Sequence, residues 1–125
     1  DNVTGVQTCA LPISINLSVS EATGCDYCLA AHTLMAKKAG FSGEQIHALR
    51  RGEYTEDARL DALVKFAQTL VTTTGTLPEA DVAALRHAGF SDQQVIEIIS
   101  AVSAILFTNM VNRVNDTVVD FPKAD

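Results

Sequence analysis

Apolar side chains recur along most of the chain at the spacing of amphipathic helices. The clearest stripe lies between residues 57 and 73, where apolar positions follow an i, i+3, i+4, i+7 order. Its members are Leu60, Leu63, Val64, Ala67, Leu70 and Val71. From residue 16 onward no stretch shows the two-residue alternation of a strand. The pattern therefore predicts an all-α fold.

Caps and turn residues divide the chain into six predicted helices. Ser42 and Ser91 are each followed three residues later by a glutamine, which is the pattern of a capping box at a helix start. Gly40 suits the end of one helix, and Pro78 suits the first turn of another. The predicted helices cover residues 16–23, 25–39, 42–51, 57–73, 79–88 and 92–117.

The last predicted helix is apolar nearly all round between Val95 and Met110. Such a helix is usually central and buried, or buried in a subunit interface. The broad apolar faces of so small a chain also predict burial against other subunits. We therefore expect an oligomerising helical protein.

Residues 1–14 differ from the rest because they show neither a helical nor a strand period. They contain no basic n-region and no apolar h-region, so they do not match a signal peptide. The run from Val3 to Ile13 closely resembles the conceptual translation of a sequencing-library adapter. We therefore expect residues 1–14 to be a non-native leader and residues 15–125 to form one N-terminally truncated helical domain. Cys9 then takes no part in the cysteine chemistry.

Composition and charge exclude several classes of protein. Hydrophobic residues make up 47% and charged residues 19%, which is typical of a chain with a packed core. The net charge of −6 argues against a nucleic-acid binder and against a polybasic membrane-surface protein. The longest apolar run, residues 98–107, is too short to span a bilayer. No targeting signal is visible, so we expect a cytoplasmic protein without nucleic-acid or membrane partners.

Candidate chemistry is concentrated in a C-x-x-C-x-x-x-H motif formed by Cys25, Cys28 and His32. Gly24 precedes the motif, which places Cys25 at a helix start, where the positive end of the helix favours a thiolate. His32 lies four residues after Cys28, close enough to take its proton, and Cys25 and Cys28 are spaced for a disulfide within one turn. A helical wheel puts all three on one face with Leu29, Met35, Ala36 and Ala39, whereas Asp26, Thr33, Lys37 and Lys38 fall outside it.

This arrangement favours thiol redox chemistry, because a thiolate that peroxide oxidises to a sulfenic acid can be captured by a second cysteine. Three alternatives stay open: a disulfide oxidoreductase that does not use peroxide, a zinc site, and a non-enzymatic helical module in which the three side chains are buried packing. Zinc is disfavoured because no fourth ligand lies at a useful spacing. We expect neither a metal nor another cofactor.

The segment from Asn16 to His32, NLSVSEATGCDYCLAAH, resembles the core of the carboxymuconolactone decarboxylase and alkylhydroperoxidase D-like (AhpD-like) superfamily. The KKAGFS that follows and the C-terminal TNMVNRVNDTVVDFP are similar to its peroxidase-related branch. The resemblance covers residues 15–122 and implies an AhpD-like helical bundle that assembles as a homotrimer or hexamer.

The resemblance also implies a reaction. It predicts reduction of hydrogen or alkyl hydroperoxides, with Cys28 as the peroxidatic residue, Cys25 as the resolving residue and His32 in the proton relay. A dithiol, such as a thioredoxin-like or lipoyl protein, would be the reductant. Cys25 would be the more reactive thiol from its place at the helix start alone, but the His32 spacing and the resemblance both favour Cys28.

Two positions depart from the family pattern. The family usually has a glutamate twelve residues before the first motif cysteine, where it completes the relay, and this chain has Ile13 there. Glu21 lies only four residues before Cys25 and does not take that role. Some members have a histidine immediately before the second cysteine, where this chain has Tyr27.

Other polar residues are expected to lie outside the site. His47 and His87 follow helix caps and are expected to face solvent. Asn109, Asn112 and Asp116 line up along the last helix and could line a polar pocket near the thiols. We expect them instead at the exposed or interfacial edge of that helix.

Overall fold

Six helices and no strand make up the part of the chain that the structure describes. The computed structural model describes the backbone of residues 3–125 and the side chains from residue 10 onward. Its elements are α1 (Val3–Thr23), α2 (Asp26–Lys38), α3 (Gly43–Arg51), α4 (Ala58–Thr73), α5 (Glu79–His87) and α6 (Asp92–Asn115). The predicted all-α class is confirmed.

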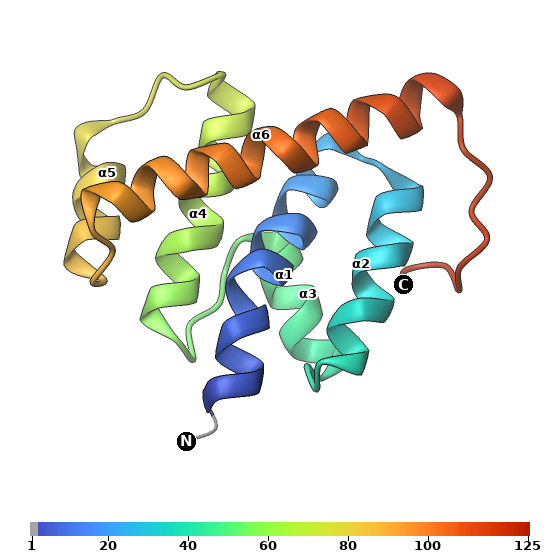
Figure 1. The fold of residues 1–125 in the computed structure, drawn as a ribbon, viewed down its shortest axis with the longest axis horizontal. Helices are drawn as coiled ribbons and strands as arrows, with labels where there is room; N and C mark the ends of the chain where they lie inside the picture. Colours follow the sequence, from blue (N-terminus) through green and yellow to red (C-terminus); the bar gives the residue numbers. More distant parts are fainter. Residues whose placement is uncertain (1–2) are drawn as a thin grey trace.

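Helix α1 is the centre of the molecule (Figure 1). It packs against α2, α3, α4 and α6, and its Leu17 and Val19 are fully buried. Ser14, Ser18 and Ser20 are fully buried as well, so most of the surface of α1 between residues 13 and 20 is covered. A segment covered in this way needs no amphipathic period, and residues 3–14, which carried no helical signal, continue into it as one helix.

The predicted boundary between residues 14 and 15 lies inside this helix. The expected short segment of residues 16–23 is the second part of one continuous α1, which even includes Pro12. Ala10 and Ile13 belong to the same hydrophobic core as Leu17 and Val19. That residues 1–14 are a non-native leader stays a prediction, and residues 1 and 2 lie outside the described part.

Both predicted capping boxes are confirmed. Ser42 Oγ accepts from the backbone N–H of Gln45 at 3.1 Å, and Gln45 Oε1 accepts from the backbone N–H of Ser42 at 2.9 Å. Ser91 and Gln94 repeat the arrangement at the start of α6, with distances of 3.1 and 2.8 Å. The helix starts could therefore be predicted to the residue.

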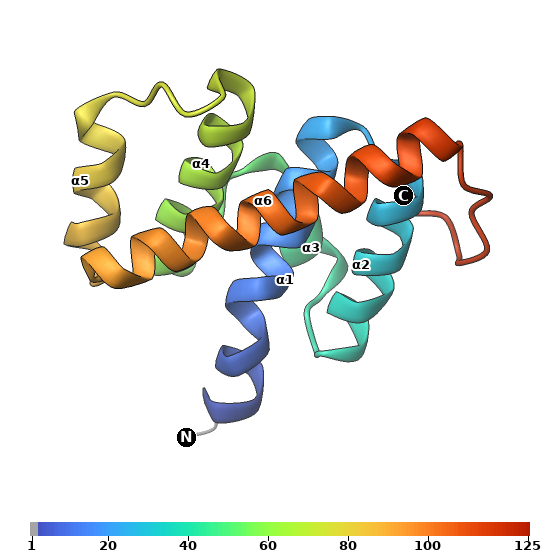
Figure 2. The ribbon, with the colours of Figure 1, turned by 45° about the horizontal axis from the view of Figure 1, so that its top comes forward.

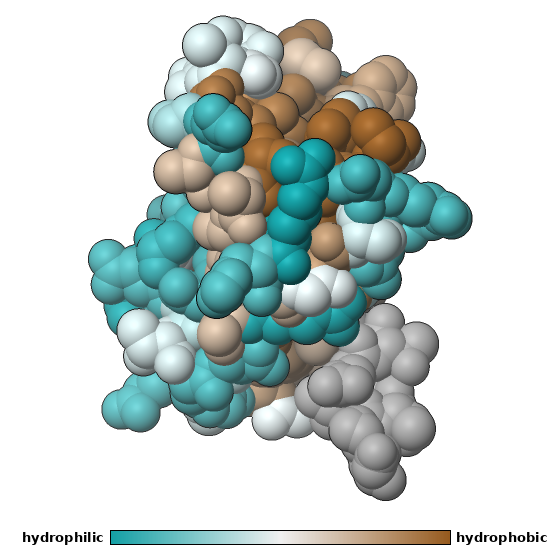
Figure 3. Space-filling view, turned by 90° about the vertical axis from the view of Figure 1, so that its left-hand side faces the viewer, coloured by the Kyte–Doolittle hydropathy of each residue, from teal (hydrophilic) through white to brown (hydrophobic). Residues whose placement is uncertain are grey.

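Helix α6 crosses one side of the molecule and packs on α1, α2 and α4 (Figures 1 and 2). Only one of its faces is buried in this chain, through Ile98, Val102, Ile105 and Asn109. The opposite face exposes Ile96, Ile99, Phe107, Met110, Val111 and Val114. The expectation of a central helix was therefore wrong for a single chain, because α1 already occupies the centre. Apolar side chains gather at the upper part of the molecule in Figure 3.

By length and composition, α6 is the one helix in the described part of the chain that could cross a membrane. The uninterrupted apolar run of residues 98–107 is too short for a span, but α6 extends beyond it at both ends. The finding is weak evidence for a membrane, because a core helix of a soluble protein passes the same test. Here one face of α6 covers α1.

Candidate active site

The site begins at the tight connection between α1 and α2. Gly24 has a left-handed backbone with φ of 69°, a conformation that costs glycine little. The backbone N–H groups of Gly24 and Cys25 donate back to the carbonyls of Glu21 and Ser20, which closes α1. The chain therefore turns within two residues and enters α2 at the first cysteine.

Cys25 is the N-cap residue of α2, as its position after Gly24 predicted. Its Sγ accepts from the backbone N–H of Cys28 at 3.3 Å. A sulfur thus occupies the position that serine or aspartate oxygen usually takes at a helix start. The partial positive charge of the helix end lies beside this sulfur.

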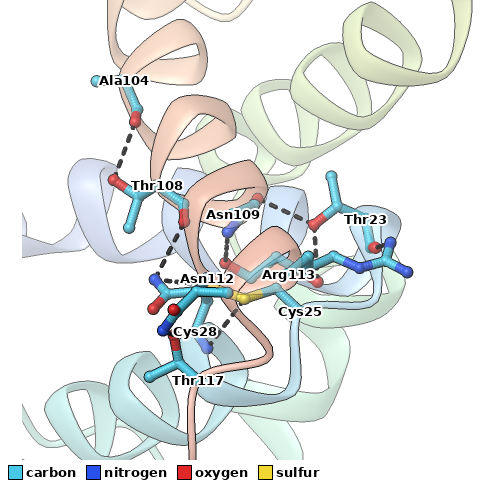
Figure 4. Close-up of a disulfide and its surroundings, with 11 residues drawn as sticks. Thr23, Cys25, Cys28, Ala104, Thr108, Asn109, Asn112, Arg113 and Thr117 are labelled. Atoms are coloured by element: carbon cyan, nitrogen blue, oxygen red, sulfur yellow. Dashed lines mark hydrogen bonds between the residues drawn. A yellow bond between two sulfur atoms is a disulfide. The ribbon is translucent and has the colours of Figure 1, made fainter.

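Cys25 and Cys28 form a disulfide in the structure, with their Cα atoms 5.3 Å apart (Figure 4). The two residues are only 1% and 2% exposed. The i, i+3 spacing in the sequence therefore does place the two sulfurs together. Which of them reacts first stays a prediction, with Cys28 as the expected nucleophile.

The buried face of α2 is broader than the helical wheel predicted. Thr33, expected outside this face, is buried, whereas Met35, expected inside it, is 52% exposed. The reason is that α2 packs against three helices, α1, α3 and α6, which cover a wide arc of its surface. Cys28 and Leu29 lie within the covered arc as expected.

His32 is half-buried on α2, one turn after Cys28. Its Nδ1 is buried and has no hydrogen-bond partner among the described residues. Burial lowers the pKa of the imidazole below its usual 6.5, so the ring is neutral at pH 7 and free to accept a proton. No hydrogen bond joins this ring to either sulfur in the described part of the chain. Ile13, at the family's glutamate position, is buried and offers no carboxylate to Nδ1.

Helix α6 supplies an amide to the site that the sequence analysis left out. Asn112 Nδ2 donates to Cys28 Sγ at 3.7 Å and to the carbonyl of Thr108 at 3.0 Å (Figure 4). The expectation that Asn112 belongs to an edge of α6 outside the site was therefore wrong. The signal was present in the sequence, because amides three residues apart in an apolar helix need polar partners.

Asn109 lies one turn earlier on α6 and is fully buried, again against expectation. Its Nδ2 donates to Ser20 Oγ at 3.2 Å, and its Oδ1 accepts from Thr23 Oγ1 at 2.9 Å. Arg113 donates from Nη1 to the carbonyl of Thr23. These contacts fix α6 to the end of α1, immediately before the cysteines. Asp116, the third residue of the expected row, is exposed and ends the helix.

The C-terminal segment after α6 turns back toward α2 (Figures 1 and 2). The ring of Phe121 meets Tyr27 edge-on with centroids 5.4 Å apart, and Arg50 donates to the carbonyl of Asp125 at 2.6 Å. The segment walls a hollow of about 260 Å³ beside Cys25. Its lining includes Gly24, Cys25, Tyr27, Asn112, Arg113 and Thr117.

The remaining candidates lie away from the sulfurs. His87 is exposed as expected, whereas His47 is half-buried and lies 3.7 Å from a carboxylate oxygen of Asp125. Among the described residues, no three His, Cys, Asp or Glu side chains come together in a geometry that could hold a metal ion.

The sequence around the disulfide matches the model of a known protein family. Residues 14–69 match the model of the carboxymuconolactone decarboxylase family. The match covers a little under half of the chain, so this segment is similar to the carboxymuconolactone decarboxylase family. The match includes α2 and its C-x-x-C-x-x-x-H motif. No curated protein matches the sequence.

Solved structures of AhpD-like proteins share this fold. A peroxidase-related protein from Silicibacter sp. TM1040 is 23% identical with a TM-score of 0.72, and the match covers 90% of this chain and 58% of that one. A candidate AhpD antioxidant defence protein from Agrobacterium tumefaciens is 22% identical with a TM-score of 0.77, over 94% and 84% of the two chains.

The debrominase Bmp8, solved with 2,3,4-tribromopyrrole, is 20% identical with a TM-score of 0.76, over 93% and 67% of the two chains. At these identities the comparisons establish the fold alone. This chain spans little more than half the length of the Silicibacter protein.

Proposed function

We propose that this AhpD-like protein is a thiol-dependent peroxidase that reduces hydrogen peroxide or alkyl hydroperoxides. The observation that carries the proposal is the Cys25–Cys28 disulfide at the start of α2, with a neutral His32 one turn further on. The family match supports a possible antioxidant role for this pair.

The oxidative half-reaction uses both cysteines. His32 takes the proton of the Cys28 thiol, and the thiolate attacks the terminal oxygen of the hydroperoxide. The O–O bond breaks, the alkoxide leaves with the electron pair, and the proton on His32 converts it to an alcohol. Cys28 is now a sulfenic acid. The Cys25 sulfur attacks the Cys28 sulfur, the S–O bond breaks, and water leaves with the proton of Cys25.

The reductive half-reaction uses an external dithiol. A thiolate of the donor attacks the sulfur of Cys25, a residue that lines the hollow beside α2, and Cys28 leaves as a thiolate. The second donor thiol then releases Cys25, and the donor departs as a disulfide with its two protons left on the cysteines. Neither half-reaction needs a metal, a flavin or a haem.

Self-association belongs to the proposal. Phe107, Met110, Val111 and Val114 are exposed along one side of α6, and an apolar face of this kind is typical of a subunit interface. We propose a homo-oligomer, a trimer or hexamer, as the resemblance implies. Light scattering coupled to size exclusion measures the subunit count.

Stopped-flow oxidation of the reduced protein tests the peroxidase. A Cys9→Ser background leaves Cys25 and Cys28 as the two thiols, and free thiols are counted before and after peroxide is added. Loss of two thiols per chain, much faster than in free cysteine, is the expected result. Turnover that survives in Cys28→Ser would contradict the assignment.

The alternative function is that of a disulfide oxidoreductase, which would use Cys25 and Cys28 without peroxide. Rapid exchange with a protein disulfide, together with oxidation by peroxide only at the rate of free cysteine, would favour it. The variant Ile13→Glu places a carboxylate at the family's relay position. If only this variant reduces peroxide fast, the slow reaction of the parent chain is due to the carboxylate that its proton relay lacks.

A further inference from the structure

The two sulfurs of the disulfide accept hydrogen bonds from donors on two different helices. Cys25 Sγ receives the backbone N–H of Cys28 at 3.3 Å, within α2 itself. Cys28 Sγ receives Asn112 Nδ2 at 3.7 Å from α6, a helix that is distant in the sequence (Figure 4). These distances suit N–H···S bonds, so Asn112 is a hydrogen-bond donor to the second sulfur.

The geometry of Asn112 is fixed by its own helix. Its Nδ2 also donates to the carbonyl of Thr108 at 3.0 Å, which holds the amide plane against α6. Its backbone carbonyl accepts from the N–H of Thr117 at 3.1 Å, so the helix end is closed around it. One N–H of the amide is therefore committed to the helix and the other is left for the sulfur.

The place of α6 above the site is fixed in turn by Asn109. This residue is fully buried and bonds both Ser20 and Thr23 at the end of α1. The register between α6 and the cysteines therefore cannot shift without breaking a buried network. A donor held in this way is preorganised, so it need not be ordered when charge develops on the sulfur.

We propose that Asn112 is a further catalytic residue of the thiol reaction, whose amide N–H stabilises negative charge on Cys28 Sγ. The inference rests on the redox use of the Cys25–Cys28 pair in the proposed function. A hydrogen bond favours the charged form of an acceptor over the neutral form. Asn112 therefore raises the fraction of Cys28 that is a thiolate ready to attack.

The same contact acts in the return step. When a donor thiolate attacks Cys25 Sγ, the S–S bond breaks and its electron pair goes to Cys28 Sγ. The Asn112 N–H, which already donates to this sulfur in the disulfide form, stabilises that negative charge. The residue thus favours Cys28 over Cys25 as the leaving sulfur.

The test measures ionisation of one thiol and needs no peroxide. In a background of Cys9→Ser and Cys25→Ser, Cys28 is the only thiol, and serine still caps α2 because it is a preferred N-cap residue. The rate of alkylation by iodoacetamide is measured across a pH series. The midpoint of that profile reports where Cys28 ionises.

We expect Asn112→Leu to move this midpoint upward by about one pH unit, which is about a tenfold loss of thiolate at a fixed lower pH. Asn112→Asp should move it further, because a carboxylate would then face the thiolate. The matched control is Asn115→Leu, an exposed amide on the last turn of α6 that bonds only Thr117 among the described residues. Its midpoint should not move.

Unchanged midpoints in both Asn112 variants, with far-UV circular dichroism like the parent's, would overturn the inference. Peroxide kinetics separate this failure from failure of the proposed function. If the midpoint moves and peroxide still reacts at the rate of free cysteine, the donor role of Asn112 stands and the peroxidase does not.

Discussion

Replacement of Asn109 by alanine is expected to destabilise the protein by about 3 kcal/mol. Two hydrogen bonds, to Ser20 Oγ and from Thr23 Oγ1, are lost in a fully buried place. Each is worth about 1 kcal/mol, and the Ser20 hydroxyl loses its buried partner. The cavity left by the missing carboxamide adds about 1 kcal/mol.

This loss translates into a clear shift of the melting temperature. An unfolding entropy of about 2.1 cal/mol/K per residue gives about 0.26 kcal/mol/K for 125 residues. A loss of about 3 kcal/mol therefore lowers Tm by about 11 °C. Thermal unfolding followed by circular dichroism measures it, at one fixed protomer concentration because self-association would change the apparent stability.

The matched control is Asn115→Ala, on the same helix but exposed, which should change stability by less than about 0.5 kcal/mol. Urea unfolding checks that the slope of the transition is the same in both variants. If Asn109→Ala melts within about 2 °C of the parent with an unchanged slope, the buried network does not hold α6 to α1, and the reasoning fails.

Two further predictions concern protonation and backbone geometry. Burial lowers the pKa of His32 below 6.5, so the unfolded chain binds the proton more readily than the folded chain. The free energy of unfolding should therefore fall as pH drops through 6.5 and level off below the lowered pKa. Urea unfolding at a series of pH values measures this, and His32→Gln should flatten this part of the profile. Gly52 has φ of 77°, and a Cβ there would meet the side chain of Gln68, which donates to the carbonyls of Ser18 and Arg50. Gly52→Ala should therefore lower the free energy of unfolding by about 1–2 kcal/mol. Gly43 lies in open space at a helix start, so Gly43→Ala should be neutral or slightly stabilising. A lower melting temperature for Gly43→Ala than for Gly52→Ala would contradict this argument.

Local signals in the sequence predicted the starts of α3 and α6 and the meeting of the two cysteines. Ser42 and Ser91 determine their helix starts through side chains only three residues away. Cys25 and Cys28 need only one helical turn to meet. Features decided within a few residues are visible in a single sequence, because they do not depend on distant packing.

Features that depend on distant packing were missed. The extent of α1 could not be predicted because residues 1–14 lack the amphipathic period by which a helix is recognised in a sequence. Asn112 could not be assigned to Cys28, since the contact joins residues 84 positions apart in the sequence. The exposure of Met35 and burial of Thr33 follow from which helices surround α2, and a helical wheel does not contain that information.

The capping of α2 by Cys25 gives this protein a built-in spectroscopic reporter. The amide proton of Cys28 points at Cys25 Sγ, and its resonance frequency depends on the electron density of the atom that accepts it. Thiol, thiolate and disulfide sulfur differ in that density, so a single backbone signal distinguishes the redox states of the pair. A redox titration followed at this one amide would report the ratio of the dithiol to the disulfide form of the pair.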